Sequence, residues 1–223
     1  ALAAAQSHDL PVISHCEDLD LVAGGVMNAG AVAREMKLAG ISNASESAMV
    51  ERDIALSELT GAPVHIAHVS TAESVQALRE AKSRSLKVTA ETAPHYFMLT
   101  DEAVRQCGTD AKMNPPLRSA EDREAIRRGL ADGTIDVIAT DHAPHSTREK
   151  AVEFKAAANG IIGLETAVSL GLKLVQEGVI SLTQLIEKMS TNPARILGLE
   201  SGLRPDRSAD ITIIDPHLAF RVD

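Results

Sequence analysis

Residues 119–140, SAEDREAIRRGLADGTIDVIAT, place a helix and a strand in direct succession, and this unit indicates the fold class. Ser119 and Asp122 are typical of a helix start, and Gly133 is typical of the position just after a helix end. Residues 134–140 are apolar and rich in isoleucine and valine, as expected of a buried strand. A helix that leads directly into a strand is typical of an α/β fold.

The same alternation continues on both sides of this unit. Further strands are predicted at 11–16, 63–70 and 86–94, and further helices at 45–61, 71–85 and 164–197, the last interrupted near Gly178. Strands that alternate with helices predict the α/β class, with a parallel sheet and the helices outside it. The final stretch, 208–223, alternates between polar and apolar residues and is predicted to be β structure.

The composition is that of an ordinary globular protein: of 223 residues, 44% are hydrophobic and 24% are charged. The net charge of -9 argues against nucleic acid and anionic membranes as partners, because phosphates would be repelled, but leaves a small anionic substrate open. No apolar run approaches the roughly 20 residues of a membrane span, and the opening residues lack the features of a signal peptide. Cys16 and Cys107 form no CxxC pair, which favours a reducing cytoplasm.

Ionisable side chains stand at the end of each of the four predicted strands: His15, His68, Glu91 with His95, and Asp141. In a (β/α)8 barrel the carboxyl ends of the strands meet at one mouth, where the active sites of that fold lie. Two imidazoles and a carboxylate from successive strands predict a zinc site there. Any one of these histidines alone is as well explained as a core or loop residue, but four strand ends in the same pattern favour a site.

Eight motifs occur in an order that resembles one enzyme family. They are HCED (15–18), HIAHVSTAES (65–74), VTAETAPHYFMLTDE (88–102), KMNPPLR (112–118), DVIATDHAPHSTREK (136–150), NGIIGLETA (159–167), TNPARILGL (191–199) and SADITIIDP (208–216). The chain resembles the bacterial class I dihydroorotase family, within the metal-dependent amidohydrolase superfamily. MNPPLR together with TDHAPH is specific to that family, whereas HVS and ADITIID also occur in hydantoinases and allantoinases.

The resemblance implies roles for individual residues. His15 and His68 take the places of two zinc ligands, and Asp141 takes the place of an aspartate that binds the metal and moves the proton in catalysis. A carboxylate suits that work, because it can accept a proton from water and return it to a leaving amide nitrogen.

The resemblance also implies a substrate site. Asn114 and His145 match positions that hold the carboxylate of the substrate, while Asn159 and Gly160 match a loop that presents backbone groups to the pyrimidine ring. Other polar residues near the motifs are interpreted as structural or as supports of the ligands: His65, Glu91, His95 and His142. Arg118 and Lys150 flank two motifs and have no assigned partner.

The implied reaction is the reversible cyclisation of N-carbamoyl-L-aspartate to L-dihydroorotate in pyrimidine biosynthesis, with one or two zinc ions. The resemblance further implies a homo-oligomer and a contact with aspartate carbamoyltransferase. Two alternatives stay open. One is a hydantoinase-like or allantoinase-like cyclic amidohydrolase, and the other is a non-catalytic homologue that serves as a scaffold for aspartate carbamoyltransferase.

The chain departs from the family pattern in one respect. The family opens with an HxH metal motif on its first strand and supplies a bridging carboxylate or carboxylated lysine before the HCED motif, and neither precedes His15 here. A whole barrel takes about 250 residues, and four strands are predicted. We therefore interpret residues 1–200 as strands five to eight, the C-terminal half of a (β/α)8 TIM-type barrel. Residues 201–223 are interpreted as a segment of a small composite β subdomain.

Overall fold

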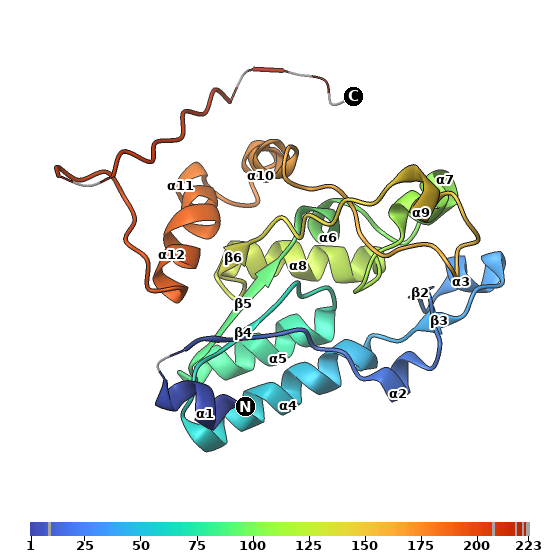
Figure 1. The fold of residues 1–223 in the computed structure, drawn as a ribbon, viewed down its shortest axis with the longest axis horizontal. Coiled ribbons are helices and arrows are strands. Elements are labelled where there is room, and N and C mark those ends of the chain that lie inside the picture. Colours follow the sequence, from blue (N-terminus) through green and yellow to red (C-terminus); the bar gives the residue numbers. More distant parts are fainter. Residues whose placement is uncertain (9, 207, 217, 220, 222–223) are drawn as a thin grey trace.

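The centre of the fold is a parallel sheet, seen in a computed structural model that describes residues 1–8, 10–206, 208–216, 218–219 and 221 (Figure 1). Its strands follow the order β1 (Val12–Ser14), β4 (Val64–Ile66), β5 (Val88–Thr92) and β6 (Val137–Ile138). Each strand pairs in parallel with the next strand of this sheet, as successive strand–helix units require. All four predicted strands of the sheet are thereby confirmed.

A long helix follows each strand of this sheet: α4 (Ala44–Thr60), α5 (Ala72–Ser83), α8 (Ala120–Asp132) and α10 (Ala167–Gln176). Figure 1 shows α4, α5 and α8 side by side along the sheet, and α5 contacts both of its neighbours. Local signals set the ends of these helices. Ser119 and Asp122 form a reciprocal capping box at the start of α8, and Gly61 and Gly133 end α4 and α8 with positive φ angles.

Shorter elements fill the connections. They are α1 (Leu2–Ser7), α2 (Leu19–Val22), β2 (Met27–Asn28), α3 (Ala31–Met36), β3 (Gly40–Ile41), α6 (Pro94–Met98), α7 (Ala103–Cys107), a 3-10 turn (Gly108–Ala111), α9 (Thr147–Lys150), α11 (Leu182–Ile186), a π turn (Glu187–Thr191) and α12 (Asn192–Ile196). The predicted helix at 164–197 is thus divided into α10 and the run from α11 to α12, with Gly178 between them at a positive φ angle.

The core is mostly aliphatic, in keeping with the low aromatic content. One buried cluster, which includes Ile66, Leu78, Phe97 and Ile126, lies between the sheet and its helices. A second cluster, which includes Met27 and Met113, lies under the connection between β1 and α4. None of the helices in the described part of the chain is long and apolar enough to cross a membrane.

The structure differs from the predicted secondary structure in two places. β2 and β3 form a separate parallel pair, Met27 with Gly40 and Asn28 with Ile41, in a stretch where no strand was predicted. Two-residue strands carry no periodicity by which a sequence could reveal them. The predicted β structure at 208–223 does not form among the described residues of that stretch. Its assignment to a β subdomain stays a prediction, and residues 207, 217, 220 and 222–223 lie outside the described residues.

Candidate active site

The carboxyl ends of β1 and β4 bring two predicted ligands together. His15 directly follows β1, His68 lies two residues after β4, and His15 Nδ1 is 2.8 Å from His68 Nε2. The rings meet edge to face with centroids 4.7 Å apart. Two imidazoles on one tetrahedral zinc ion have their nitrogens roughly 3.3 Å apart, since each Zn–N bond is about 2.0–2.1 Å. The observed separation is about half an ångström shorter and is that of a hydrogen bond between the two rings, so the rings would move slightly apart to share a metal ion.

The surroundings of the two rings also suit metal ligands. His15 Nε2 lies 3.2 Å from Glu17 Oε2, and a metal-binding histidine commonly donates its second N–H to a carboxylate. Burial and, to a smaller extent, the nearby His15 lower the pKa of His68. The lower pKa favours the neutral imidazole that a metal requires. His68 Nδ1 and His95 Nε2 are buried without a hydrogen-bond partner in the described part of the chain. Such unpaired atoms are where an ion or an ordered water is expected.

Asp141 lies beside His95 and interacts electrostatically with His68. Its Oδ2 atom is 3.8 Å from His95 Nε2, and no group of three His, Cys, Asp or Glu side chains among the described residues is placed to hold a metal ion. Asp141 and His68 both adopt positive φ angles, 46° and 35°, a strained conformation that clusters at functional sites. Two imidazoles leave a tetrahedral ion without its full set of ligands. The role of Asp141 as a ligand stays a prediction.

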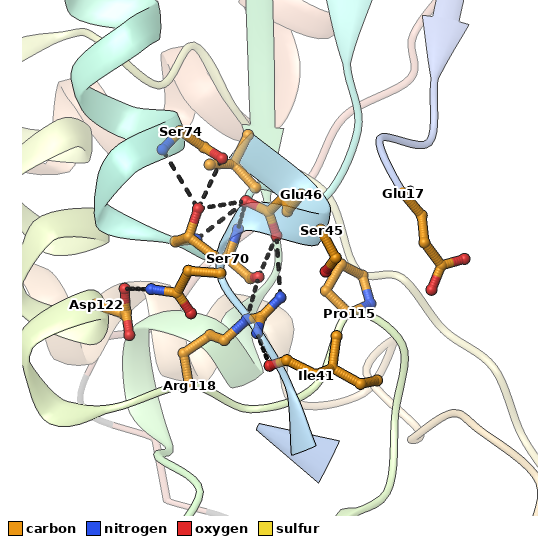
Figure 2. A network of polar contacts seen from close by, with 12 residues as sticks. Glu17, Ile41, Ser45, Glu46, Ser70, Ser74, Pro115, Arg118 and Asp122 are labelled. Atoms are coloured by element: carbon orange, nitrogen blue, oxygen red, sulfur yellow. Dashed lines mark hydrogen bonds and ion pairs between the residues drawn. The ribbon is translucent and has the colours of Figure 1, made fainter. Parts of the chain in front are cut away.

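A buried carboxylate fixes the loop that carries His68 (Figure 2). Glu46, in the first turn of α4, accepts the backbone N–H groups of Ser70 at 3.0 Å and Thr71 at 3.1 Å, and both hydroxyl groups as well. Thr92 Oγ1 also donates to this loop, to the carbonyl of Val69 at 2.9 Å. The backbone of residues 69–71, just beyond His68, is therefore fixed by hydrogen bonds from two different elements.

Arg118 is the cation of this network. Its Nη2 lies 4.0 Å from Glu46 Oε2, and both side chains are almost fully buried. The guanidinium donates to the carbonyl of Ile41 at 2.9 Å and to Ser70 Oγ at 3.2 Å (Figure 2). Arg118 thus links β3 to the loop after β4, a partner set that the sequence did not suggest.

Glu17 links a predicted metal ligand to a predicted substrate residue. One carboxylate oxygen faces His15, and the other accepts from Asn114 Nδ2 at 3.0 Å. A cavity of about 240 Å³ opens beside this contact, and its lining includes Glu17, Lys112, Asn114, Lys155 and Asn159. Glu17 is a functional candidate that residue-by-residue reasoning missed, although it lies within the HCED motif.

The remaining predicted substrate residues pack against each other. His145 Nε2 donates to the carbonyl of Asn159 at 2.8 Å. Gly160 has a φ angle of 141°, and a Cβ atom there would lie 2.6 Å from the Cβ atom of Ala143. Only glycine therefore permits this approach of the two loops. The structure brings Asn114 and Asn159 to one cavity and places His145 and Gly160 directly beside Asn159.

His65 and His142 have protein partners. His65 lies in β4, as interpreted from the sequence, and its ring bonds to Thr89 Oγ1 at 2.8 Å and faces Glu91 Oε2 at 3.2 Å. His142 Nδ1 accepts the backbone N–H groups of Gly163 and Leu164, at 3.1 and 3.2 Å. These contacts account for His65, Glu91 and His142 as supports of local structure.

Curated relatives cover the whole of this chain. A dihydroorotase from Desulforapulum autotrophicum is 61% identical over 214 residues, which are 96% of this chain and 50% of that protein. A dihydroorotase from Pelobacter propionicus is 58% identical over 100% of this chain and 53% of its own length. The chain therefore spans about half the length of the curated relatives it matches.

Solved structures agree with the expected fold. An L-hydantoinase (dihydropyrimidinase) from Arthrobacter aurescens superposes with a TM-score of 0.78 at 26% identity, over 88% of this chain and 45% of that one. A D-hydantoinase gives 0.74 at 29% identity, over 86% of this chain and 44% of that one. The α/β fold with strand–helix units of a (β/α)8 barrel is confirmed. The amidohydrolase family model matches residues 1–222, and the chain belongs to that family.

Proposed function

We propose that this chain forms part of a zinc-dependent dihydroorotase of the cytoplasm. The enzyme would interconvert L-dihydroorotate and N-carbamoyl-L-aspartate by opening and closing a cyclic amide. The pairing of His15 and His68 at the strand ends, beside a polar cavity, carries the proposal. Identities of 55–61% to dihydroorotases support it over hydantoinase activity, because the hydantoinases compared share 24–29%.

The side chains of this chain divide the work. His15 and His68 would hold the metal ion, with Glu17 orienting His15 through its second ring nitrogen. A bound zinc ion supplies a Lewis acid and makes water acidic enough to react near neutral pH. Asp141 accepts the proton of the attacking water and returns it to the amide nitrogen that leaves the ring.

Recognition of the substrate falls to the other predicted residues. Asn114 has two amide donors, and His145 has one ring N–H to give when neutral, so both suit a carboxylate. In the structure these donors bond to Glu17 and to the carbonyl of Asn159, and substrate would replace those partners. The backbone of Asn159 and Gly160 then borders the ring. A small molecule is the expected substrate, while the homo-oligomer and the contact with aspartate carbamoyltransferase stay predictions.

A substrate panel tests the proposed function in the complete protein. We expect turnover of dihydroorotate to exceed that of dihydrouracil, hydantoin and allantoin by at least an order of magnitude in kcat/KM. Preference for hydantoin or allantoin would favour the other cyclic amidohydrolases. Absence of turnover of all four by the zinc-loaded protein would favour the non-catalytic scaffold.

The Asp141→Asn variant tests the proton transfer. Because an amide cannot accept and return the proton, we expect less than a tenth of the wild-type rate with an unchanged circular dichroism spectrum. The control is Asp210→Asn, at an exposed position in the tail, which should keep the wild-type rate. A rate for Asp141→Asn above a tenth of wild type would contradict the assigned role.

A further inference from the structure

Two buried lysines tie together the loops that carry the predicted substrate residues. Lys150 Nζ donates to three backbone carbonyls, those of Thr109 at 3.0 Å, Lys112 at 2.9 Å and Ala158 at 3.0 Å. Lys112 Nζ donates to two more, those of Lys155 at 3.2 Å and Ala157 at 2.7 Å. Together the two ammonium groups hold the segment 155–158 against the segment 109–112.

These contacts lead directly to Gly160. The carbonyl of Lys112 accepts both from Lys150 Nζ, at 2.9 Å, and from the backbone N–H of Gly160, at 3.0 Å. Asn159 lies between the last carbonyl held by Lys150 and this amide, and its own carbonyl accepts from His145. The position of Asn159 and Gly160 beside the cavity thus depends on a carbonyl that Lys150 fixes.

The partners of the two lysines are unusual for buried cations. Among the described residues neither ammonium forms an ion pair with a carboxylate, and every hydrogen bond that either one donates goes to the backbone. Burial lowers the pKa of both groups, which reflects the cost of keeping each charge there. An ammonium has three donors, and Lys150 satisfies all three. An apolar residue could fill the same volume without that cost, so the charge serves to fix the carbonyls.

We propose that Lys150 and Lys112 are positioning residues that hold the loop 155–160 in the shape in which Asn159 and Gly160 contact the cyclic substrate. They act on substrate binding, because the loop that they hold carries Asn159, which lines the cavity beside Glu17 and Asn114. The binding role rests on the proposed dihydroorotase function, whereas the effect on the loop does not. A purely global stabilising role would instead affect all parts of the fold alike.

The test uses Lys150→Met in the complete protein, compared with wild type and with Lys173→Met, an exposed lysine on α10. Methionine keeps the length and apolar stem of lysine but donates no hydrogen bond. Hydrogen exchange is measured on peptides that cover 155–160 and on peptides of α5. We expect exchange at 155–160 to be at least tenfold faster in Lys150→Met alone, with α5 unchanged. Unchanged exchange at 155–160, or equal acceleration in α5, would overturn the proposal.

Kinetics and zinc content complete the test. We expect KM for dihydroorotate to rise about tenfold while kcat stays within threefold, with zinc content equal to wild type. A fall in kcat at constant KM would overturn the binding role. If wild type does not turn over dihydroorotate, the proposed function fails, and the exchange measurement still decides the role of the loop. Should Lys150→Met not fold, Lys112→Met replaces it with exchange read at 155–157. Global unfolding of both variants would contradict a local role.

Discussion

A buried charged side chain holds the loop after His68, and another holds the loop 155–160. The two charges have opposite signs. Glu46 accepts backbone N–H groups at Ser70 and Thr71, whereas Lys150 donates to backbone carbonyls. The first loop leads into the start of α5, where the first N–H groups of a helix have no acceptor in a preceding turn and the helix dipole favours an anion. The second loop has no regular structure and turns its carbonyls inward. The backbone group that each loop exposes therefore selects the charge that holds it.

The two loops differ also in what compensates the buried charge. Glu46 has Arg118 at 4.0 Å, and Arg118 in turn bonds to Ile41 and Ser70. Among the described residues Lys150 forms no ion pair; its hydrogen bonds go to three carbonyl groups, and the Asp110 carboxylate acts on it only from a longer distance. Removal of Glu46 therefore strands a second buried charge, and removal of Lys150 strands none. The anionic network around Glu46 should therefore contribute more to global stability. The cationic network around Lys150 should contribute more to the local conformation of the loop 155–160.

The largest effect is expected for Glu46→Gln in the complete protein. In wild type the two carboxylate oxygens of Glu46 accept four hydrogen bonds, but the glutamine amide has only one acceptor oxygen. The substitution also leaves Arg118 buried without a counter-charge. We expect a loss of about 3–5 kcal/mol in the free energy of unfolding, measured by urea denaturation. Zinc retention on dialysis should also fall, because the loop that carries His68 loosens.

The control for that variant is Glu73→Gln. Glu73 also lies in the first turn of a helix and accepts a hydrogen bond from Asn43, but it is exposed. We expect its unfolding free energy to change by less than about 1 kcal/mol. If Glu46→Gln also lowered the unfolding free energy by less than about 1 kcal/mol and kept the wild-type zinc content, the proposed difference between the two networks would be wrong.

A smaller effect, confined to binding, is expected for Asn114→Ala. Asn114 lies on the side of the lysines and faces the cavity, so its loss should leave global stability within about 1 kcal/mol of wild type. A hydrogen bond to a charged group contributes about 1.5–3 kcal/mol, and dihydroorotate should therefore bind at least tenfold more weakly. Dihydrouracil lacks the carboxylate and should lose little affinity. Equal losses for both ligands, by calorimetry, would contradict carboxylate recognition by Asn114.

The sequence predicted those parts of the fold that local signals determine. The predicted helices 45–61 and 119–133 matched the structure closely, because Gly61, Ser119 and Gly133 act on their own neighbours. The pairing of His15 with His68 followed from their common place at strand ends. These features need only the regular geometry of strand–helix units.

The two buried networks could not be predicted in the same way. Glu46 meets Ser70 across 24 residues, and Arg118 meets Ile41 across 77. No spacing rule connects such residues, since their contact depends on how the connections pack. Lys150 stands in a recognisable motif, yet its partners are backbone carbonyls, which carry no mark in a sequence. The position of Asp141 beside His95 likewise depends on packing across the sheet.

The last prediction concerns the reactivity of the two cysteines, one on each side of the comparison. Cys16 lies on the side of the anionic network, where burial raises the pKa of its thiol to about 12, and Cys107 is exposed at the end of α7. Because the thiolate is the reactive form, a shift from 9.0 to about 12 lowers the reactive fraction roughly a thousandfold. At pH 8, iodoacetamide should therefore modify Cys107 at least a hundredfold faster, as followed by peptide mass spectrometry.

Glu46→Gln makes this measurement a test of the network itself. If Glu46 holds the packing around the strand ends, the variant should bring the modification rate of Cys16 closer to that of Cys107, while Lys150→Met should leave the rate of Cys16 unchanged. Urea-unfolded protein, in which both thiols are equally accessible, gives the reference ratio. Equal rates for the two cysteines in folded wild type would contradict the burial of Cys16. Acceleration of Cys16 by Lys150→Met would show that the two networks stabilise the same region rather than different ones.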